Sequence, residues 1–301
     1  MIRKAYDAKF CSQKLRMNNE MMVFQHTRKN VICHICGCKT SFFGPEGVSL
    51  REATCPVCGA TQRASDVAGV IIHTFSKNDT LPLSKTSLSL VSKKIYESQS
   101  IGIIHECLKN LPDYHCSEYF DDVMPGGLNK NGILCQDLQK LTFSDNSFDL
   151  VITQDVFEHI QEPEKAFAEI HRVLKPGGYH IFTIPYHEGK KTLRRITIED
   201  GKKVFNFSPV YHGDPLRQQG ALVYTDFGED FVTMLESESF VTDAFLCGQW
   251  YDSDEIPTIL DETSYDTYLK YYNTNDLCRF FKYNSWVFRT QKSANRVKNN
   301  A

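Results

Sequence analysis

Residues 146–185 read NSFDLVITQDVFEHIQEPEKAFAEIHRVLKPGGYHIFTIP, and this stretch decides the fold. Residues 148–153 are mostly apolar and β-branched, as expected of a strand that is buried on both faces. Pro163 suits the first turn of a helix, and residues 175–178 (KPGG) end that helix because proline cannot continue it. Residues 179–184 form a second buried strand. The stretch therefore predicts a strand–helix–strand crossover in a parallel α/β sheet.

Two runs within this stretch, FDLVITQDVFEHI at 148–160 and AFAEIHRVLKPGG at 166–178, resemble class I S-adenosylmethionine (SAM)-dependent methyltransferases of the type 11 kind. The resemblance implies a Rossmann-like α/β fold with a seven-stranded sheet. It also implies that SAM lies across the carboxyl ends of the first strands. Gln154 and Asp155, which follow the first strand of the crossover, are then expected beside the methionine part of the cofactor.

The composition suits one large domain plus a small one, since the chain has 301 residues, of which 41% are hydrophobic. No apolar run is long enough to cross a bilayer, and residues 1–20 lack the apolar core of a signal peptide. Eleven cysteines without a secretion signal favour reduced thiols or metal ligands over disulfides. We therefore expect a cytoplasmic protein that is not associated with membranes.

The charge is unevenly distributed. Residues 1–63 hold ten Lys/Arg and four Asp/Glu, a net +6, whereas the remaining residues hold 24 and 33, a net −9. A basic head on an acidic body keeps a nucleic-acid partner as an alternative. We favour the simpler interpretation, a solvated basic tail over residues 1–30 with at most one short helix.

Two CxxC pairs predict a small metal-binding module, because eighteen residues separate them and a glycine follows each. Two such turns point four thiolates at one ion and complete a closed tetrahedral site, so the predicted Zn²⁺ is structural. The alternative is a set of four free buried thiols. Cys38 and His34 are interpreted as bystanders. The predicted ligands are Cys33, Cys36, Cys55 and Cys58.

The domain organisation follows from these motifs. A zinc ribbon and a helix that continues from it occupy residues 31–75, with the helix over 61–75. Residues 76–90 are rich in Ser, Lys and Leu and are expected to be a linker. The methyltransferase domain is then expected over residues 91–301.

The first strand of that domain is expected at residues 94–97, with Glu97 at its end. The loop that follows, ESQSIG at 97–102, contains one glycine, Gly102, where most class I methyltransferases have several. An acidic residue followed by serine is similar to a subset of zinc-ribbon methyltransferases of polysaccharide and natural-product clusters. The resemblance therefore implies cofactor contacts at Glu97 and Gly102.

Residues 114–117 and 133–138 are expected to be the second and third strands. Glu118 follows the second strand, where a carboxylate accepts hydrogen bonds from both hydroxyls of a ribose. By resemblance, Asp137 accepts a hydrogen bond from the adenine amino group and Leu138 packs near the ring. Either carboxylate alone is equally typical of a surface position, but their order at successive strand ends favours cofactor binding.

The segment 186–226 is far longer than an ordinary connection and predicts a lid or a substrate clamp. His212 and Asp214 are candidates for a base and the group that orients it, although their HGDP context also suits a structural turn. His159 is a second candidate base, or a residue that only caps and packs. His187 adds to the polar residues of this segment, and Arg194 and Arg195 could hold a phosphate or carboxylate of the substrate.

The leading hypothesis is a SAM-dependent methyltransferase that acts on a small molecule or a sugar intermediate. One alternative is an RNA methyltransferase that docks its substrate through the basic ribbon, but no RNA-binding motif accompanies the basic residues. Another is a non-catalytic protein that kept the fold and lost SAM, which the single-glycine loop supports. The sequence leaves the acceptor atom and the oligomeric state open.

Overall fold

The computed structural model describes residues 3–5, 25–45, 50–76, 81–187, 190–214, 216–238, 240–250 and 283–293. The chain divides into two compact units. One comprises Met1–Arg3, Leu90–Ala244 and Phe288–Ala301, and the other comprises Lys4–Ser89 and Phe245–Val287. No helix of the described residues has both the length and the apolar character needed to cross a membrane.

The main sheet has seven strands in the order β1-β14-β15-β7-β6-β4-β5. Its parallel part is built from β4 (Ile95–Glu97), β5 (Tyr114–Cys116), β6 (Phe148–Gln154) and β7 (Leu174–Thr183). The remaining strands are β15 (Tyr283–Lys292), which runs antiparallel to β7, β14 (Phe240–Trp250) and β1 (Arg3–Ala5). The predicted Rossmann-like sheet is confirmed.

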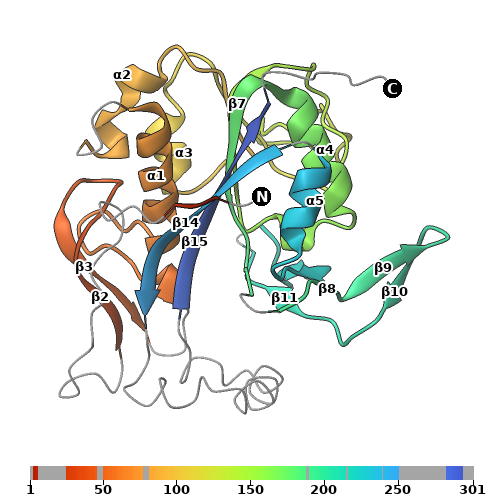
Figure 1. Cartoon of the computed structure of the whole chain (residues 1–301). Coiled ribbons are helices and arrows are strands. Elements are labelled where there is room, and N and C mark those ends of the chain that lie inside the picture. Colours follow the sequence, from red (N-terminus) through yellow and green to blue (C-terminus); the bar gives the residue numbers. More distant parts are fainter. Residues whose placement is uncertain are drawn as a thin grey trace. The chain divides into compact units, whose positions relative to one another are not determined.

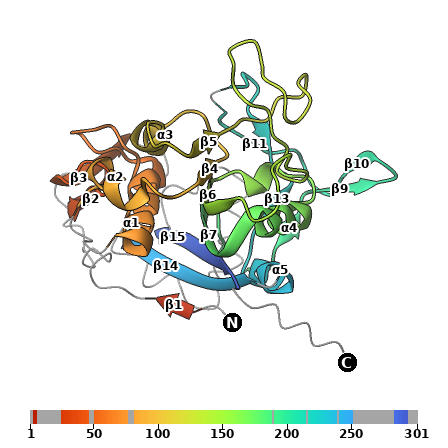
Figure 2. The same ribbon diagram turned by 90° about the horizontal axis from the view of Figure 1, so that it is seen from above.

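Helices flank the parallel strands on both sides. In Figures 1 and 2, α4 (Pro163–Val173) and α5 (Phe231–Ser237) lie on one side of β7, and α3 (Ile103–Leu108) lies on the other. A short 3-10 helix, η3 (Phe157–His159), follows β6. This arrangement leaves the carboxyl ends of β4, β5 and β6 to the loops that follow them.

The crossover predicted from residues 146–185 is confirmed, with Pro163 in the first turn of α4. The KPGG run does not form a separate turn between helix and strand. It belongs to β7, whose pairing with β6 shifts register between Phe148 and Leu150. Gly177 has φ +80°, a conformation that glycine adopts without strain.

The prediction of a third strand at residues 133–138 is wrong. Residues 133–138 make only isolated bridges, of which Glu118 with Cys135 is parallel and places the segment beside the end of β5. Within the described residues, β1 takes the place of a seventh strand instead. The apolar start of ILCQDL suited a strand, but only the bridge between Glu118 and Cys135 pairs it in parallel with the residues that follow β5.

The core of this unit is aromatic. Phe157 and Phe167 stack at 4.0 Å between ring centroids, and His180 stacks on Phe182 at 4.4 Å. His180 is fully buried, which lowers its pKa to about 3, so its ring is neutral and packs as an aromatic group. Each buried aromatic side chain of this kind contributes roughly 1.5–3 kcal/mol through burial. The core fixes β6, η3, α4 and β7 relative to one another.

The C-terminal strand is longer than predicted. The residues from Thr290 onward are polar, a composition typical of a frayed tail, but Thr290 is fully buried and pairs with His180 of β7. The acidic, tyrosine-rich stretch at 250–275 lies outside the described residues beyond Trp250, and so do most of residues 1–24.

The long segment after β7 is a set of small antiparallel pairs rather than an open loop. They are β8 (Leu193–Arg194) with β13 (Thr225–Asp226), β9 (Ile196–Glu199) with β10 (Lys202–Phe205), and β11 (Tyr211–His212) with β12 (Ala221–Leu222).

The second unit contains the cysteine pairs. Its elements are β2 (Gln25–Ile32) paired with β3 (Lys39–Pro45), η1 (Leu50–Glu52), α1 (Gln62–Phe75), η2 (Leu83–Lys85) and most of α2 (Ser87–Leu90). Helix α1 matches the predicted helix, and the Thr61 hydroxyl caps it by accepting from the Ala64 amide at 3.1 Å.

The predicted linker is partly structured. Residues 83 and 84 donate backbone hydrogen bonds to the carbonyls of His34 at 2.7 Å and Ile35 at 3.3 Å, inside the first CxxC turn. These bonds attach the segment to the ribbon. The difference arises because the Ser- and Lys-rich composition describes solvent-exposed side chains, whereas the hydrogen bonds are made by the backbone.

Candidate active site

Glu97 lies at the carboxyl end of β4 and is fully buried. The Tyr114 hydroxyl donates to its Oε2 atom at 2.7 Å, and His105 Nδ1 lies 2.9 Å from the same hydroxyl. Burial raises the pKa of Glu97 to about 8, and the hydrogen bonds from Tyr114 and Gln154 offset part of this rise. The sheet therefore places a carboxyl group of unusual basicity next to the loop that follows β4.

That loop is tied to the end of the neighbouring strand. Glu118 Oε1 accepts hydrogen bonds from the Ser100 amide at 2.7 Å and from its hydroxyl at 2.9 Å. Gly102 has φ +105° and directly precedes α3. Burial raises the pKa of Glu118, while the two Ser100 bonds lower it. The serine in the loop thus shapes the site by orienting the carboxylate predicted to bind ribose.

A cavity of about 350 Å³ opens next to these groups. It is lined by Tyr119 to Pro125, which follow Glu118, and by Asp137. The Asp137 carboxylate accepts from the Gln139 amide at 2.8 Å, and Leu138 is buried. Asp137, which was predicted to contact adenine, is therefore one of the residues that line this cavity.

The end of β6 carries Gln154 and Asp155. Gln154 is buried, and its side-chain amide lies 3.3 Å from Gln99 Oε1 in the loop after β4. Asp155 has φ +50°, a left-handed conformation that costs a non-glycine residue free energy, and its amide donates to the Thr183 carbonyl at 3.0 Å. Both residues lie at the carboxyl ends of the parallel strands, as Glu97 does.

A second cluster of ionisable side chains lies at η3, after the end of β6. It includes Glu158, which is 1% exposed. His212 Nδ1 lies 3.5 Å from Glu158 Oε1, and His159 Nε2 lies 3.6 Å from the same oxygen. The two imidazole rings meet edge to face, with centroids 5.2 Å apart. The structure thus brings together both histidines predicted as bases, from positions 53 residues apart in the sequence.

The β11–β12 pair positions these side chains. His212 pairs with Ala221, and the next residue of β12, Leu222, accepts a hydrogen bond from His159 Nδ1 at 2.9 Å. The Tyr224 amide donates to the Glu158 carbonyl at 2.7 Å. The long segment is therefore attached to η3 by backbone contacts, and it brings His212 to Glu158.

The charges around His212 favour its protonated form. The Glu158 carboxylate, placed to accept from His212 Nδ1 at 3.5 Å, raises the pKa of His212. Burial lowers this pKa, and the negative charges of Glu158, Asp155 and Asp226 raise it further. His187 behaves in the opposite way, because burial lowers its pKa to about 4.

The prediction that Asp214 orients His212 needs correction. Its carboxylate accepts from the Leu216 amide at 2.7 Å and from Arg217 at 2.5 Å, and Arg217 donates to the Tyr119 carbonyl at 2.9 Å. The group beside His212 is Glu158. His212 is the last residue of β11 and Asp214 lies beyond the strand, so their side chains contact different groups although only one residue separates them in the sequence.

The arginines predicted to hold an anionic substrate are paired within the protein. Arg195 Nε lies 2.8 Å from Asp226 Oδ2, and Arg194 contacts Glu164 and the Thr225 hydroxyl. Their guanidinium groups hold the segment to α4 and β13, so the prediction that they bind substrate is not supported.

Sequence reasoning missed the role of Glu158, which it treated only as the start of the crossover. The available signal was the EH pair directly after a buried strand. It also missed Ser100 and Tyr114, whose hydroxyls donate hydrogen bonds to Glu118 and Glu97, respectively. Nothing in the local sequence distinguishes these two residues from other serines and tyrosines.

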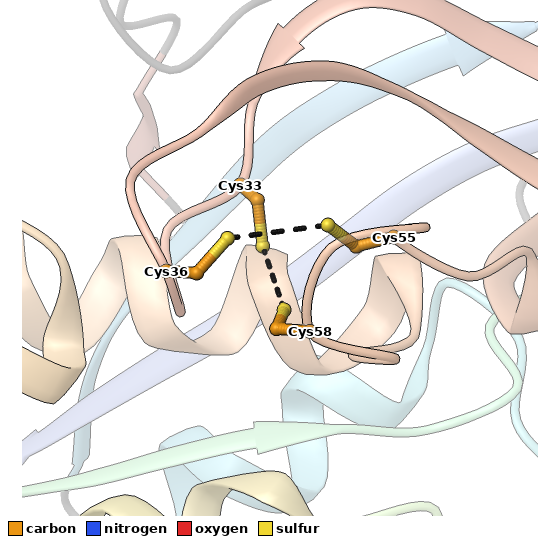
Figure 3. Close-up of side chains that lie close together, drawn as sticks. All are labelled: Cys33, Cys36, Cys55 and Cys58. Carbon is orange, nitrogen blue, oxygen red and sulfur yellow. Dashed lines mark hydrogen bonds between the residues drawn. The ribbon is translucent and has the colours of Figure 1, made fainter.

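The four cysteines of the second unit form a compact group (Figure 3). The Sγ atoms of Cys33 and Cys58 lie 3.7 Å apart, and those of Cys36 and Cys55 lie 4.0 Å apart. The Gly37 and Gly59 amides donate to the carbonyls of the first cysteine in each turn. Cys38 and His34 are outside this group.

Comparison with known proteins supports the family. A family model described as a methyltransferase domain matches residues 101–182. An uncharacterized methyltransferase of Schizosaccharomyces pombe is 52% identical over 42 residues, covering 14% of this chain and 15% of that protein. A ubiquinone/menaquinone biosynthesis C-methyltransferase of Burkholderia cenocepacia is 26% identical over 157 residues, covering 51% and 53%.

The chain thus spans about half of the length of these curated relatives or less. A solved structure of a SAM-dependent methyltransferase from Mesorhizobium loti has a TM-score of 0.36 and 13% identity, covering 66% of this chain and 91% of that one. The sheet order and the family match converge on the same segment. Residues 101–182 are therefore similar to a methyltransferase domain, and they lie within the Rossmann-like sheet.

Proposed function

We propose that this protein transfers a methyl group from SAM to a small molecule or a sugar intermediate. The observation that carries the proposal is the row of acidic side chains at successive strand ends. Glu97 is the last residue of β4, Glu118 follows β5, and Asp137 lines the cavity. Carboxylates in this order suit the polar groups along an adenosine and its attached amino acid.

The chemistry asked of the protein is modest. The sulfonium of SAM already makes the methyl group electrophilic, so the protein supplies alignment and excludes water. An oxygen or nitrogen acceptor must also lose a proton. The candidates to assist this are His159 and His212, which meet at Glu158 near the end of β6.

The acceptor class rests on the segment between β7 and β14. Its small antiparallel pairs carry His212 to the end of the sheet. The alternative of an RNA substrate rests on the basic residues of the first 63 positions, many of which lie outside the described residues. We favour a small acceptor because no RNA-binding motif accompanies these basic residues in the sequence. The cytoplasmic location stays a prediction.

Binding of SAM is tested by calorimetry on the full chain. Loss of a hydrogen-bond acceptor that is charged costs roughly 1.5–3 kcal/mol, so Glu118→Ala should weaken SAM about tenfold or more. The control is Glu106→Ala, which removes an exposed carboxylate on α3 that pairs with Lys109. Wild-type protein that does not bind SAM would instead indicate a non-catalytic relative.

We further propose that the four cysteines bind one structural Zn²⁺. A tetrahedral ion with Zn–S bonds of about 2.3 Å has sulfur–sulfur edges of about 3.8 Å, which matches the observed spacing. Four thiolates leave no position open for a substrate.

Elemental analysis should therefore find that Cys55→Ser loses zinc while Cys38→Ser retains it. A module of this size depends on such an ion for its folding, so the Cys55 variant should also melt at a lower temperature. Equal zinc contents in the two variants would reject the assignment.

A further inference from the structure

Glu158, His159 and His212 form a compact set of metal-ligating side chains. One ligand atom from each lies within 4.8 Å of the others. The Glu158 side chain is 1% exposed, and within the described part of the chain neither of its oxygens accepts a hydrogen bond of ordinary geometry, since the two histidine nitrogens lie at 3.5 and 3.6 Å from Oε1. A buried carboxylate is expensive to leave without such a partner, and a cation can satisfy it.

The orientation of His159 is an independent indication. A backbone carbonyl can only accept a hydrogen bond, so the contact of 2.9 Å with Leu222 O requires that His159 Nδ1 carries the proton. The Nε2 lone pair then points to the cluster, where Glu158 Oε1 lies at 3.6 Å. Histidines that bind metals are typically fixed in this way, with the second ring nitrogen bound to a carbonyl or a carboxylate.

We propose that Glu158, His159 and His212 bind a divalent first-row transition-metal ion. The separations of 3.5 and 3.6 Å between the carboxylate oxygen and the two nitrogens are slightly wider than the edges of about 3.0–3.4 Å expected when bonds of about 2.1 Å converge on one ion. A small movement of His212, whose side chain is 41% exposed, shortens the first separation, and a small shift of the Glu158 carboxylate toward His159 shortens the second.

The donor set indicates the class of metal. Two imidazole nitrogens and one carboxylate suit Zn²⁺, Mn²⁺ or Fe²⁺, whereas Mg²⁺ and Ca²⁺ prefer oxygen ligands alone. Three protein ligands leave coordination positions open, unlike the four thiolates of the cysteine site. The exposed side of His212 gives access to these positions.

The role of the ion rests on the proposed function. An acceptor hydroxyl that coordinates the ion becomes more acidic and releases its proton to water. The acceptor oxygen then attacks the methyl carbon of SAM, the oxygen–carbon bond forms, and the carbon–sulfur bond breaks to give S-adenosylhomocysteine. Binding of the metal itself does not depend on this step.

The test uses the full chain with its cysteine site loaded with zinc. Mn²⁺ is the probe, because thiolates favour Zn²⁺ and the spectrum of free Mn²⁺ reports its concentration directly in electron paramagnetic resonance. We expect saturable binding of one Mn²⁺ per chain without SAM or acceptor. Wild-type protein that shows no saturable binding up to about 1 mM Mn²⁺ would overturn the proposal.

Variants then identify the ligands. Glu158→Gln and His212→Ala should each weaken Mn²⁺ binding about tenfold or more, whereas His171→Gln, a histidine of α4 outside the cluster, should not. Equal affinity in all three variants would also overturn the proposal. If Glu158→Gln does not fold, the partly exposed His212 decides the matter, with the melting temperature as the check on folding.

Calorimetry with SAM on the same samples separates this proposal from the function. Mn²⁺ binding without SAM binding would retain the metal site and reject the methyltransferase. SAM-dependent methylation by protein that does not bind Mn²⁺ would retain the methyltransferase and reject the metal site. The role of the cluster would then be proton transfer without a metal.

Discussion

At the scale of single residues, Glu97 is an acid buried at a strand end where solvent is absent. Its neighbours are hydroxyl, amide and thiol groups rather than a cation, and burial raises its pKa to about 8. A carboxyl group of this kind is mostly protonated at neutral pH. It can therefore donate a hydrogen bond as well as accept one, which sets it apart from an exposed carboxylate.

Glu97 should make stability depend on pH in a defined direction. Because its pKa in the folded chain exceeds its ordinary value of 4.5, the folded state binds the proton more tightly. Its stabilising contribution is complete below pH 4.5 and is lost as the pH rises towards 8. Urea unfolding across this range should therefore show a flatter pH dependence for Glu97→Gln than for wild type.

The matched control is Glu106→Gln, which changes an exposed carboxylate on α3 whose pKa is lowered by its hydrogen bond to Lys109. This variant should keep the pH slope of the wild type between pH 5 and 8, roughly, since its carboxylate is already ionised there. Identical slopes in Glu97→Gln and wild type would show that Glu97 titrates normally.

At the scale of elements, the second glycine of KPGG decides how closely β7 approaches β6. A Cβ atom on Gly178 would lie 2.9 Å from the carbonyl oxygens of both Lys175 and Phe148. Real Cβ atoms do not approach backbone oxygens that closely, so a side chain would force the two strands apart at the register shift.

We expect Gly178→Ala to lower the free energy of unfolding by about 1–3 kcal/mol, the usual cost of forcing extra atoms into a packed site. The control is Gly213→Ala, where an added Cβ meets nothing within 4 Å. Thermal and urea unfolding measure both variants. A Gly178→Ala protein as stable as the Gly213→Ala protein would mean that the strands adjust freely.

At the scale of the whole segment between β7 and β14, one connection reaches two parts of the site. His212 joins the cluster at η3, while Arg217 bonds Asp214 and the Tyr119 carbonyl beside the cavity. The charge of Arg217 also lowers the pKa of Glu118, the residue predicted to bind ribose. The sequence alone suggested that this segment serves only the acceptor.

Arg217→Ala should therefore weaken SAM binding about three- to tenfold, the effect of losing one or two partly exposed hydrogen bonds. Lys202→Ala, in the exposed β9–β10 pair of the same segment, should leave the affinity unchanged. Calorimetry compares the two. Unchanged affinity in Arg217→Ala would restrict the segment to the acceptor, as the sequence first suggested.

The sequence by itself determined the crossover from β6 to β7, the spacing of the cysteine pairs and the order of acidic residues at strand ends. These features are local, because helical and strand periodicity, proline and glycine positions and CxxC turns depend on residues a few positions apart. They were sufficient to predict the class of sheet before any tertiary contact was considered, whereas the family was predicted from the resemblance of residues 148–160 and 166–178 to methyltransferases.

Tertiary structure alone decided which side chains meet. It reduced the predicted third strand to isolated bridges, directed Asp214 to Arg217, and placed Glu158 between two histidines. The meeting of His212 with Glu158 depends on contacts between segments far apart in the chain, and the backbone pairing of β11 with β12 positions His212 for it. Local patterns carry no information about such pairings, because distance in space is set by the packing of the whole unit.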